Sequence, residues 1–210
     1  IEFDIQLTKD NKLIVFHDDT AKRLCGRHLE ICRASSDALS ELKVKDEPVS
    51  FLPNVFDRFD DDVNYYVELK TFKNSTIEYK RKLTFYTINE IMRRNLRSKC
   101  LIVSFDVDCL KVAKQLGYNN LGVNCKSKNK PILTKVTCKD HKAIKGNIED
   151  YKREGKRLGD RTAPELIYAW TVNNKRRMKT LINYGVKGIV TDHPDRLSEV
   201  YKDTLASSAT

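Results

Sequence analysis

The chain opens with the sequence IEFDIQL at residues 1–7, in which apolar and polar side chains alternate as they do along a β-strand. Successive side chains of a strand point to opposite faces, so Glu2 and Asp4 share one face while the apolar residues take the other. Two acids on one strand face are an odd choice for a hydrophobic core, but their oxygen atoms suit a hard metal cation. This stretch therefore predicts a strand with a cation site on its polar face.

Length and composition favour one globular domain. With 210 residues, of which 40% are hydrophobic, the chain can bury one substantial core. No apolar run approaches the roughly 20 residues that a membrane-spanning helix needs, and no signal peptide is visible. We expect no stable membrane insertion and favour the cytoplasm, although a signal peptide upstream of residue 1 would change the compartment. The oligomeric state is left open.

The formal net charge of +10 comes from 39 Lys and Arg residues against 29 Asp and Glu residues. Such an excess suits anionic partners such as phosphates, but the basic residues are scattered and favour an ordinary solvated surface. Only residues 126–130 and 175–179 form short basic runs, and neither is interleaved with the aromatic side chains typical of single-strand nucleic-acid surfaces. We therefore expect no nucleic-acid partner.

The cysteine pattern argues against a zinc ribbon or a thioredoxin-like motif, because none of the six cysteines forms a CxxC pair. A chain of this length with a real core does not need disulfides. We expect reduced thiols, although Cys25 and Cys32 flank a polar loop and could pair in an exported protein.

Short apolar runs alternate with segments of helical period, which is typical of βαβ units and a parallel sheet. Residues 9–11 are predicted to form a turn that joins the first two strands in a hairpin. Residues 126–161 are polar and Lys-rich, and apart from a strand at residues 142–144 this stretch is left unassigned. The predicted strands are residues 1–7, 13–16, 65–69, 100–104, 120–123, 142–144, 167–172 and 188–191. The predicted helices are residues 107–116, ending at Gly117; residues 174–184, with Gly185 as a left-handed cap; and residues 196–205.

Charged side chains gather near the ends of several predicted strands. Glu2 and Asp4 belong to the first strand, His17 follows the second, and Glu68 and Lys70 share one face at the end of the third. In a parallel α/β barrel the carboxyl ends of the strands converge on one mouth, where catalytic groups collect. We expect these side chains to meet in space.

The same stretches resemble the glycerophosphodiester phosphodiesterase family. The resemblance rests on IEFDIQLTKD at residues 1–10 with VFHD at 15–18, VELK at 67–70, VSF at 103–105, WTVN at 170–173 and GVKGIVTDHPD at 185–195. It implies a (β/α)8 TIM-type barrel with a small insertion, as a single domain over residues 1–205. It also implies a small-molecule substrate, either a glycerophosphodiester or a lysophospholipid.

The resemblance also implies roles for individual residues. Glu2, Asp4 and Glu68 match the carboxylate ligands of Ca²⁺ or Mg²⁺, and all-oxygen ligation is what such cations prefer. His17 matches one of two catalytic histidines, and Lys70 matches a lysine beside the metal that neutralises a phosphodiester oxygen. Trp170 matches an aromatic residue of the substrate pocket, although core filling at the barrel mouth explains it equally well.

Three further residues of these motifs are expected to have structural roles. Asp18 is expected to orient its loop rather than to touch substrate. Asp192 and His193 are expected to cap the last strand-to-helix turn.

One motif of the family is absent from the sequence. The other catalytic histidine belongs to a His-Arg-Gly motif on the first barrel strand, whereas this chain has only the reversed order Gly26-Arg27-His28 in a loop. We expect the chain to lack the first βα unit of a longer enzyme; a genuinely short protein that keeps only the metal site is the alternative. Without that unit the open strand edges predict marginal stability or aggregation.

The expected activity is metal-dependent hydrolysis of glycerophosphodiesters to glycerol 3-phosphate and an alcohol. Two alternatives stay open at this stage. One is a phospholipase D-type enzyme on the same barrel that cleaves lipids by cyclisation. The other is a catalytically silent module that binds phosphodiesters.

Overall fold

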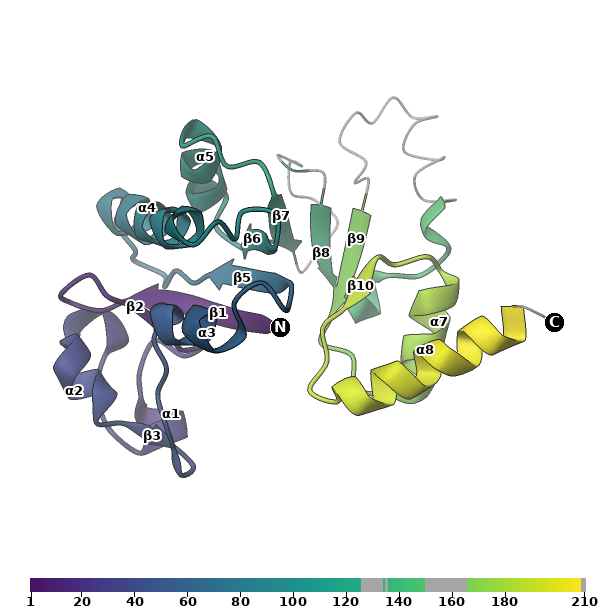
Figure 1. The fold of residues 1–210 in the computed structure, drawn as a ribbon, viewed down its shortest axis with the longest axis horizontal. Helices are drawn as coiled ribbons and strands as arrows, with labels where there is room; N and C mark the ends of the chain where they lie inside the picture. Colours follow the sequence, from purple (N-terminus) through teal and green to yellow (C-terminus); the bar gives the residue numbers. More distant parts are fainter. Residues whose placement is uncertain (126–133, 135, 150–165, 209–210) are drawn as a thin grey trace. The chain divides into compact units, whose positions relative to one another are not determined.

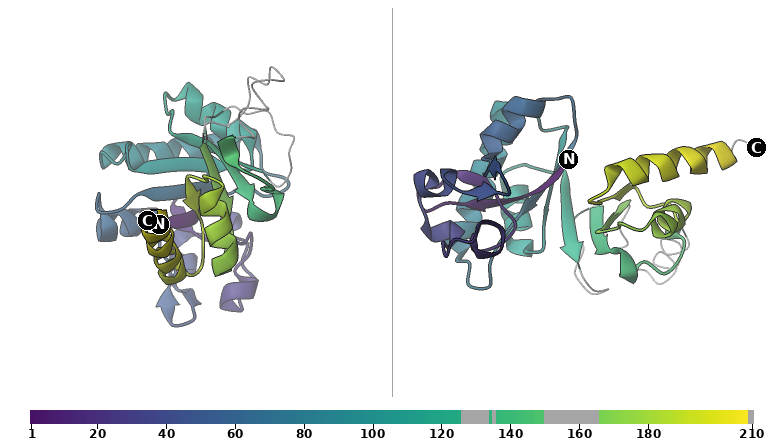
Figure 2. Two further views of the ribbon diagram at one scale, coloured as in Figure 1. Left: turned by 90° about the vertical axis from the view of Figure 1, so that its right-hand side faces the viewer. Right: turned by 90° about the horizontal axis from the view of Figure 1, so that it is seen from below.

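The computed structural model describes residues 1–125, 134, 136–149 and 166–208. The chain divides into two compact units, residues 1–121 and residues 122–210, which we describe one at a time (Figures 1 and 2). In both units strands alternate with helices, as the sequence predicts.

The sheet of the first unit has the strand order β6-β5-β1-β2. Strands β1 (Glu2–Leu7), β5 (Tyr65–Leu69) and β6 (Cys100–Ser104) run parallel, and β2 (Leu13–Val15) pairs antiparallel with β1. The predicted hairpin is therefore confirmed, and Asn11 in its turn adopts a positive φ of 60° that asparagine tolerates well.

Helices of the first unit lie against this sheet. Figure 1 shows α4 and α5 side by side along β5 and β6, while α1, α2 and the short β3–β4 hairpin gather near β2. The helices are α1 (Lys22–Cys25), α2 (Ser36–Ser40), α3 (Leu52–Phe59), α4 (Ile77–Arg93) and α5 (Val107–Gln115), with a 3-10 turn η1 (Ile31–Arg33) and strands β3 (Lys43–Val44) and β4 (Glu47–Pro48).

Side-chain caps explain where the longer helices begin. The Thr76 hydroxyl accepts a hydrogen bond from the backbone N–H of Tyr79, and the Asp106 carboxylate accepts one from that of Asp108. Helix α5 ends before Gly117, whose φ of 78° is the left-handed conformation of a helix stop. The predicted helix at residues 107–116 is confirmed.

The apolar face of β1 packs into the core of the first unit. Phe3 and Ile5 are buried, and the ring of Phe3 meets the edge of Tyr65 with 6.1 Å between centroids. Phe56 of α3 packs on the same Tyr65 ring at 4.9 Å, also edge to face. This packing fixes which face of β1 is turned toward the core, and the acids of β1 occupy the other.

The second unit holds a parallel run of strands in the order β7-β8-β9-β10. The core lies between these strands and two helices, and it contains Ile167, Ala169, Met178 and Leu181. The strands are β7 (Leu121–Cys125), β8 (Val136–Asp140), β9 (Leu166–Trp170) and β10 (Gly188–Ile189); the helices are α7 (Lys175–Asn183) and α8 (Pro194–Ser208), with a 3-10 turn η2 (His141–Ala143).

Helix boundaries in the second unit agree closely with the sequence. The Asn174 side chain caps α7 by accepting from the N–H of Arg177, and Gly185 follows at a φ of 84°. Helix α8 begins two residues earlier than predicted, at Pro194, which suits the first turn of a helix because it has no N–H to leave unpaired.

One strand was predicted in the wrong place. Residues 142–144 lie in and just after the 3-10 turn η2, and the strand is β8, directly before it. The sequence of β8, VTCKD, does not indicate a buried strand, because it contains the polar residues Thr137 and Lys139. Both are nevertheless buried, at 2% and 8% exposed. The remainder of the unassigned segment, residues 126–133, 135 and 150–161, lies outside the described part of the chain.

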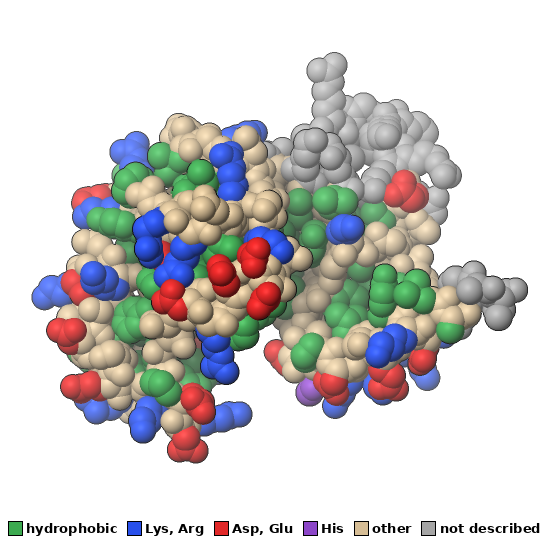
Figure 3. Space-filling model, in the orientation of Figure 1, with side chains coloured by type: hydrophobic (Ala, Val, Ile, Leu, Met, Phe, Trp, Pro, Cys, Tyr) green, Lys and Arg blue, Asp and Glu red, His purple; other side chains and the backbone are tan. Residues whose placement is uncertain are grey.

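Surface properties follow the composition. On the face in Figure 3, basic and acidic side chains are interspersed. Cys25 and Cys32, the two cysteines that could have paired, are half-buried free thiols, and the other four cysteines are buried. Among the described residues, no helix is long and apolar enough to cross a membrane. The α/β class is thus confirmed, while closure into an eight-stranded barrel and a single domain over residues 1–205 stay predictions.

The Phe56 packing leads to a stability prediction. Phe56→Ala removes a fully buried ring and should lower the free energy of unfolding by about 3–5 kcal/mol. Phe85→Ala on α4 is the matched control, because that ring is 45% exposed and should cost less than about 1 kcal/mol. Urea denaturation followed by circular dichroism measures both. Equal losses would contradict the assignment of Phe56 to the core.

Candidate functional site

Three carboxylates meet on the polar face of β1 and β5. The parallel register places Asp4 directly beside Glu68, and Glu2 lies two residues earlier on the same face of β1. Each side chain offers one oxygen, and the three oxygens lie within 4.8 Å of one another. The structure therefore brings together the three residues that the sequence singled out as cation ligands.

Lys70 is anchored between two of these acids. Its Nζ lies 3.0 Å from Asp4 Oδ1 and 2.9 Å from Glu68 Oε1, and its side chain is only 18% exposed. Burial disfavours the charged form of Lys70, but attraction to Glu68 and Asp4 outweighs it and raises the pKa of the ammonium. Lys70 is thus a fixed positive charge that follows β5.

The electrostatics of the carboxylates show an unbalanced negative charge. Partial desolvation raises the pKa of Glu2 to about 7, and repulsion from Asp4 and Glu68 adds to the shift. The side chain nevertheless keeps contact with solvent. Burial also raises the pKa of Glu68, and the attraction of Lys70 offsets part of that shift. When all three carboxyls are ionised, the ammonium of Lys70 leaves two negative charges, which is what a divalent cation would neutralise.

The donor set fits such a cation. All three candidate ligand atoms are carboxylate oxygens, the hard ligands that Ca²⁺ and Mg²⁺ prefer over nitrogen or sulfur. Glu2, Asp4 and Glu68 could therefore hold Ca²⁺ or Mg²⁺, and nothing in the donor set separates these two ions.

His17 follows β2 and is paired with its neighbour. Its Nδ1 lies 2.7 Å from Asp18 Oδ1, while 60% of the His17 side chain stays exposed. Arg23 binds the same carboxylate through two hydrogen bonds of 2.6 and 2.8 Å. These bonds from Arg23, with help from His17, lower the pKa of Asp18 to about 2. A permanently ionised Asp18 can therefore hold the Nδ1–H of His17 and leave Nε2 free.

The backbone beside His17 is tied to the acidic strand. The N–H of Phe16 donates to the carbonyl of Asp4 at 3.0 Å, so the loop of His17 begins at a candidate cation ligand. Two residues of this region escaped the sequence reasoning, namely Arg23 and Gln6; Gln6 could have been found because it continues the alternation of Glu2 and Asp4.

The remaining predicted residues lie in the second unit. Trp170 is the half-buried last residue of β9, in register with Asp140 of β8. Its role toward substrate stays a prediction.

The cap predicted at Asp192 and His193 has a different form. The Asp192 side chain accepts a hydrogen bond from Asn173 Nδ2 at 2.7 Å instead of capping α8. The N–H of His193 donates to the Thr191 hydroxyl, and the carbonyl of His193 accepts from Leu197 N in the first turn of the helix. Asn173 and Thr191, which bind Asp192 and His193, are also hydrogen-bonded to each other. These two side chains therefore stabilise the turn before α8.

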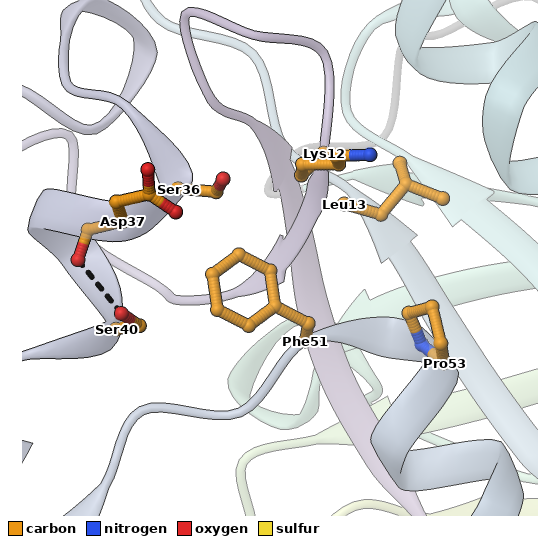
Figure 4. A pocket seen from close by; sticks show the side chains of 7 residues that line it. All are labelled: Lys12, Leu13, Ser36, Asp37, Ser40, Phe51 and Pro53. Carbon is orange, nitrogen blue, oxygen red and sulfur yellow. Dashed lines mark hydrogen bonds between the residues drawn. The ribbon is translucent and has the colours of Figure 1, made fainter.

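A separate apolar pocket of about 280 Å³ lies elsewhere in the first unit. Figure 4 shows the Phe51 ring projecting toward α2, with Leu13 and Pro53 at the other side. Its lining carries none of the site residues described above. The lining residues are Lys12, Leu13, Ser36, Asp37, Ser40, Phe51 and Pro53.

The parallel α/β fold, with an acidic cluster on the paired strands β1 and β5, defines an α/β protein with a candidate metal centre. Comparison with known protein families identifies the family. Residues 1–196 match the model of the glycerophosphoryl diester phosphodiesterase family, and the chain belongs to this family of hydrolases. The family resemblance seen in the sequence is confirmed.

Individual relatives agree over nearly the whole chain. A glycerophosphodiester phosphodiesterase of Bacillus subtilis is 28% identical over 96% of this chain and 76% of its own length. One from Caldanaerobacter subterraneus is 26% identical over 94% of this chain and 83% of its own length.

Among solved structures, a glycerophosphodiester phosphodiesterase of Parabacteroides distasonis has a TM-score of 0.78 at 24% identity, covering 99% of this chain and 84% of that one. An Oleispira antarctica phosphodiesterase, solved in complex with the product sn-glycerol-3-phosphate, has a TM-score of 0.76 at 16% identity, covering 96% and 84%. At these identities the likeness concerns the fold.

The raised pKa of Glu2 predicts a pH-dependent cation affinity. Below about pH 7 the Glu2 carboxyl keeps its proton, which a cation must displace, so affinity for Ca²⁺ or Mg²⁺ should fall by about tenfold from pH 8 to pH 6. Isothermal titration calorimetry in buffers of different ionisation enthalpy measures the affinity and the proton release. Glu2→Gln should bind more weakly and with a much smaller pH dependence. Equal affinity of the wild type at pH 6 and pH 8 would contradict the assignment.

Proposed function

We propose that this protein is a phosphoric diester hydrolase that depends on a divalent cation and cleaves glycerophosphodiesters to glycerol 3-phosphate and an alcohol. The observation that carries the proposal is the grouping of Glu2, Asp4 and Glu68 within 4.8 Å, with Lys70 against two of them. The family membership supports the class of reaction. The product in the Oleispira antarctica structure supports the glycerol phosphate half of the substrate.

Glu2, Asp4 and Glu68 would hold the cation. When bound, the ion withdraws charge from the phosphoryl oxygens and lowers the pKa of an attacking hydroxyl or water. The contribution of the protein is to hold the three carboxylates in place on two paired strands, so that the binding geometry is set before the ion arrives. Asp4 and Glu68 are the rigid members, because each is also bound to Lys70.

His17 would carry the proton transfer. Asp18 accepts from Nδ1, which leaves Nε2 to exchange a proton with the oxygen that attacks or leaves phosphorus. The ionised state of Asp18 favours an imidazole that carries a hydrogen on Nδ1 and stabilises the imidazolium when it forms. A proton transfer of this kind typically contributes about 10²–10⁴-fold to the rate.

Lys70 and Trp170 would bind the substrate. The Lys70 ammonium lies beside the carboxylates, where it can also pair with an anionic phosphoryl oxygen. Trp170, at the end of β9, would pack on the glycerol or head group. We propose a lysophospholipid as the second substrate class, since it presents the same phosphodiester.

The proton-transfer role leads to a mutational prediction. His17→Ala should lower kcat on glycerophosphocholine by at least about 100-fold, because it removes the only proton carrier that the proposal assigns. Binding of Ca²⁺ or Mg²⁺ should stay nearly intact, since the three carboxylates are untouched. His28→Ala is the matched control for loss of an imidazole. Joint loss of turnover and cation binding in His17→Ala would refute the role.

The nature of the product separates this hydrolase from its alternatives. Phosphorus NMR should show a phosphomonoester, glycerol 3-phosphate, as the phosphate-containing product. A cyclic phosphate would instead assign the protein to the phospholipase D type.

Thermal unfolding, combined with an activity assay, distinguishes the proposed hydrolase from a catalytically silent binding module. Ca²⁺ or Mg²⁺ should raise the melting temperature of the wild type by more than that of Glu2→Gln at the same cation concentration, in a protein that also turns over substrate. Stabilisation by the cation without turnover would identify a module that only binds.

A further inference from the structure

Gln6 is a buried polar residue in the middle of β1. It is 1% exposed, and its place two residues after Asp4 puts it on the strand face that carries the acids. A buried amide needs hydrogen-bond partners, because an unpaired buried donor has lost the bonds that it made with water. The identity of those partners shows what the residue does.

Both hydrogens of the Gln6 amide are used on the same loop. Nε2 donates to the carbonyl of Phe16 at 2.8 Å and to the carbonyl of Asp18 at 2.9 Å. These two carbonyls stand immediately before and after His17. One amide group thus binds the backbone on both sides of the proposed proton carrier.

The two bonds reach the loop at the point where it has left the sheet. Strand β2 ends at Val15, and the N–H of Phe16 makes the last contact with β1 through the carbonyl of Asp4. The side-chain bonds from Gln6 therefore replace strand pairing at the point where pairing stops. A primary amide suits this task, since its NH₂ presents two donors from one atom.

We propose that Gln6 is a positioning residue that holds His17 in register with the carboxylates of β1. The proposal rests on the role proposed above for His17. Glu2, Asp4 and Gln6 stand on one strand at a spacing of two residues, so a single rigid element sets both the cation site and the location of the imidazole. Misplacing a reacting group by about 1 Å can cost about 100-fold in rate.

The test compares Gln6→Met, which keeps the shape and removes both donors, with Thr87→Val. Thr87 is equally buried and donates one hydrogen bond to the carbonyl of Leu83 in α4, so its variant reports the loss of a buried bond away from the site. Gln6→Met should lower kcat by about 10- to 100-fold with the cation affinity unchanged. Thr87→Val should leave kcat within twofold.

A readout independent of turnover tests the tether itself. The ¹⁵N heteronuclear NOE of the amides of His17 and Asp18 should fall in Gln6→Met and stay at the wild-type value in Thr87→Val. An unchanged NOE in Gln6→Met would overturn the proposal, whatever the activity of the protein.

A double variant separates this proposal from the proposed function. If Gln6 acts through His17, Gln6→Met should cause no further loss of rate in a His17→Ala background. A full additional loss there would overturn the positioning role. A wild-type rate in His17→Ala would instead refute the assignment of His17 and so the catalytic half of the proposal, while the NOE would still decide whether Gln6 holds the loop.

Discussion

The parallel register of β1 on β5 is the constraint on which the site depends. It sets Asp4 beside Glu68 and lets Lys70 reach both, at 3.0 and 2.9 Å. A shift of one residue would turn the acids into the apolar core and the apolar residues toward the site. The packing of Phe3 against Tyr65 therefore helps to fix the register that places the charged side chains on the opposite face.

The charges themselves work against the folded state. A carboxyl whose pKa is raised to about 7, as that of Glu2 is, binds a proton more tightly when folded than when unfolded. Without a cation, this group therefore weakens the fold as the pH rises from its ordinary pKa toward 7. Apolar packing holds together a set of acids that repel one another, which is typical of sites built to bind and to react.

Sequence reasoning succeeded where a local period determines the structure. Alternation along residues 1–7 placed Glu2 and Asp4 on one face, and Gly117 marked the end of α5 correctly. Prediction from the sequence failed where tertiary contacts determine which residues are buried or bonded. The strand β8 was missed because its polar residues are buried by tertiary contacts that no local pattern reveals. The bonds of Gln6 likewise join residues ten and twelve positions apart, and only the folded hairpin brings them together.

The most direct test of the account is a crystal structure determined with Mn²⁺, whose anomalous signal locates the ion. The account predicts one anomalous peak bound by one oxygen from each of Glu2, Asp4 and Glu68, at about 2.0–2.6 Å as for other hard cations. Density for Lys70 should remain beside Asp4 and Glu68. A peak bound by other residues, or none at saturating Mn²⁺, would contradict the central claim that these carboxylates form a cation site.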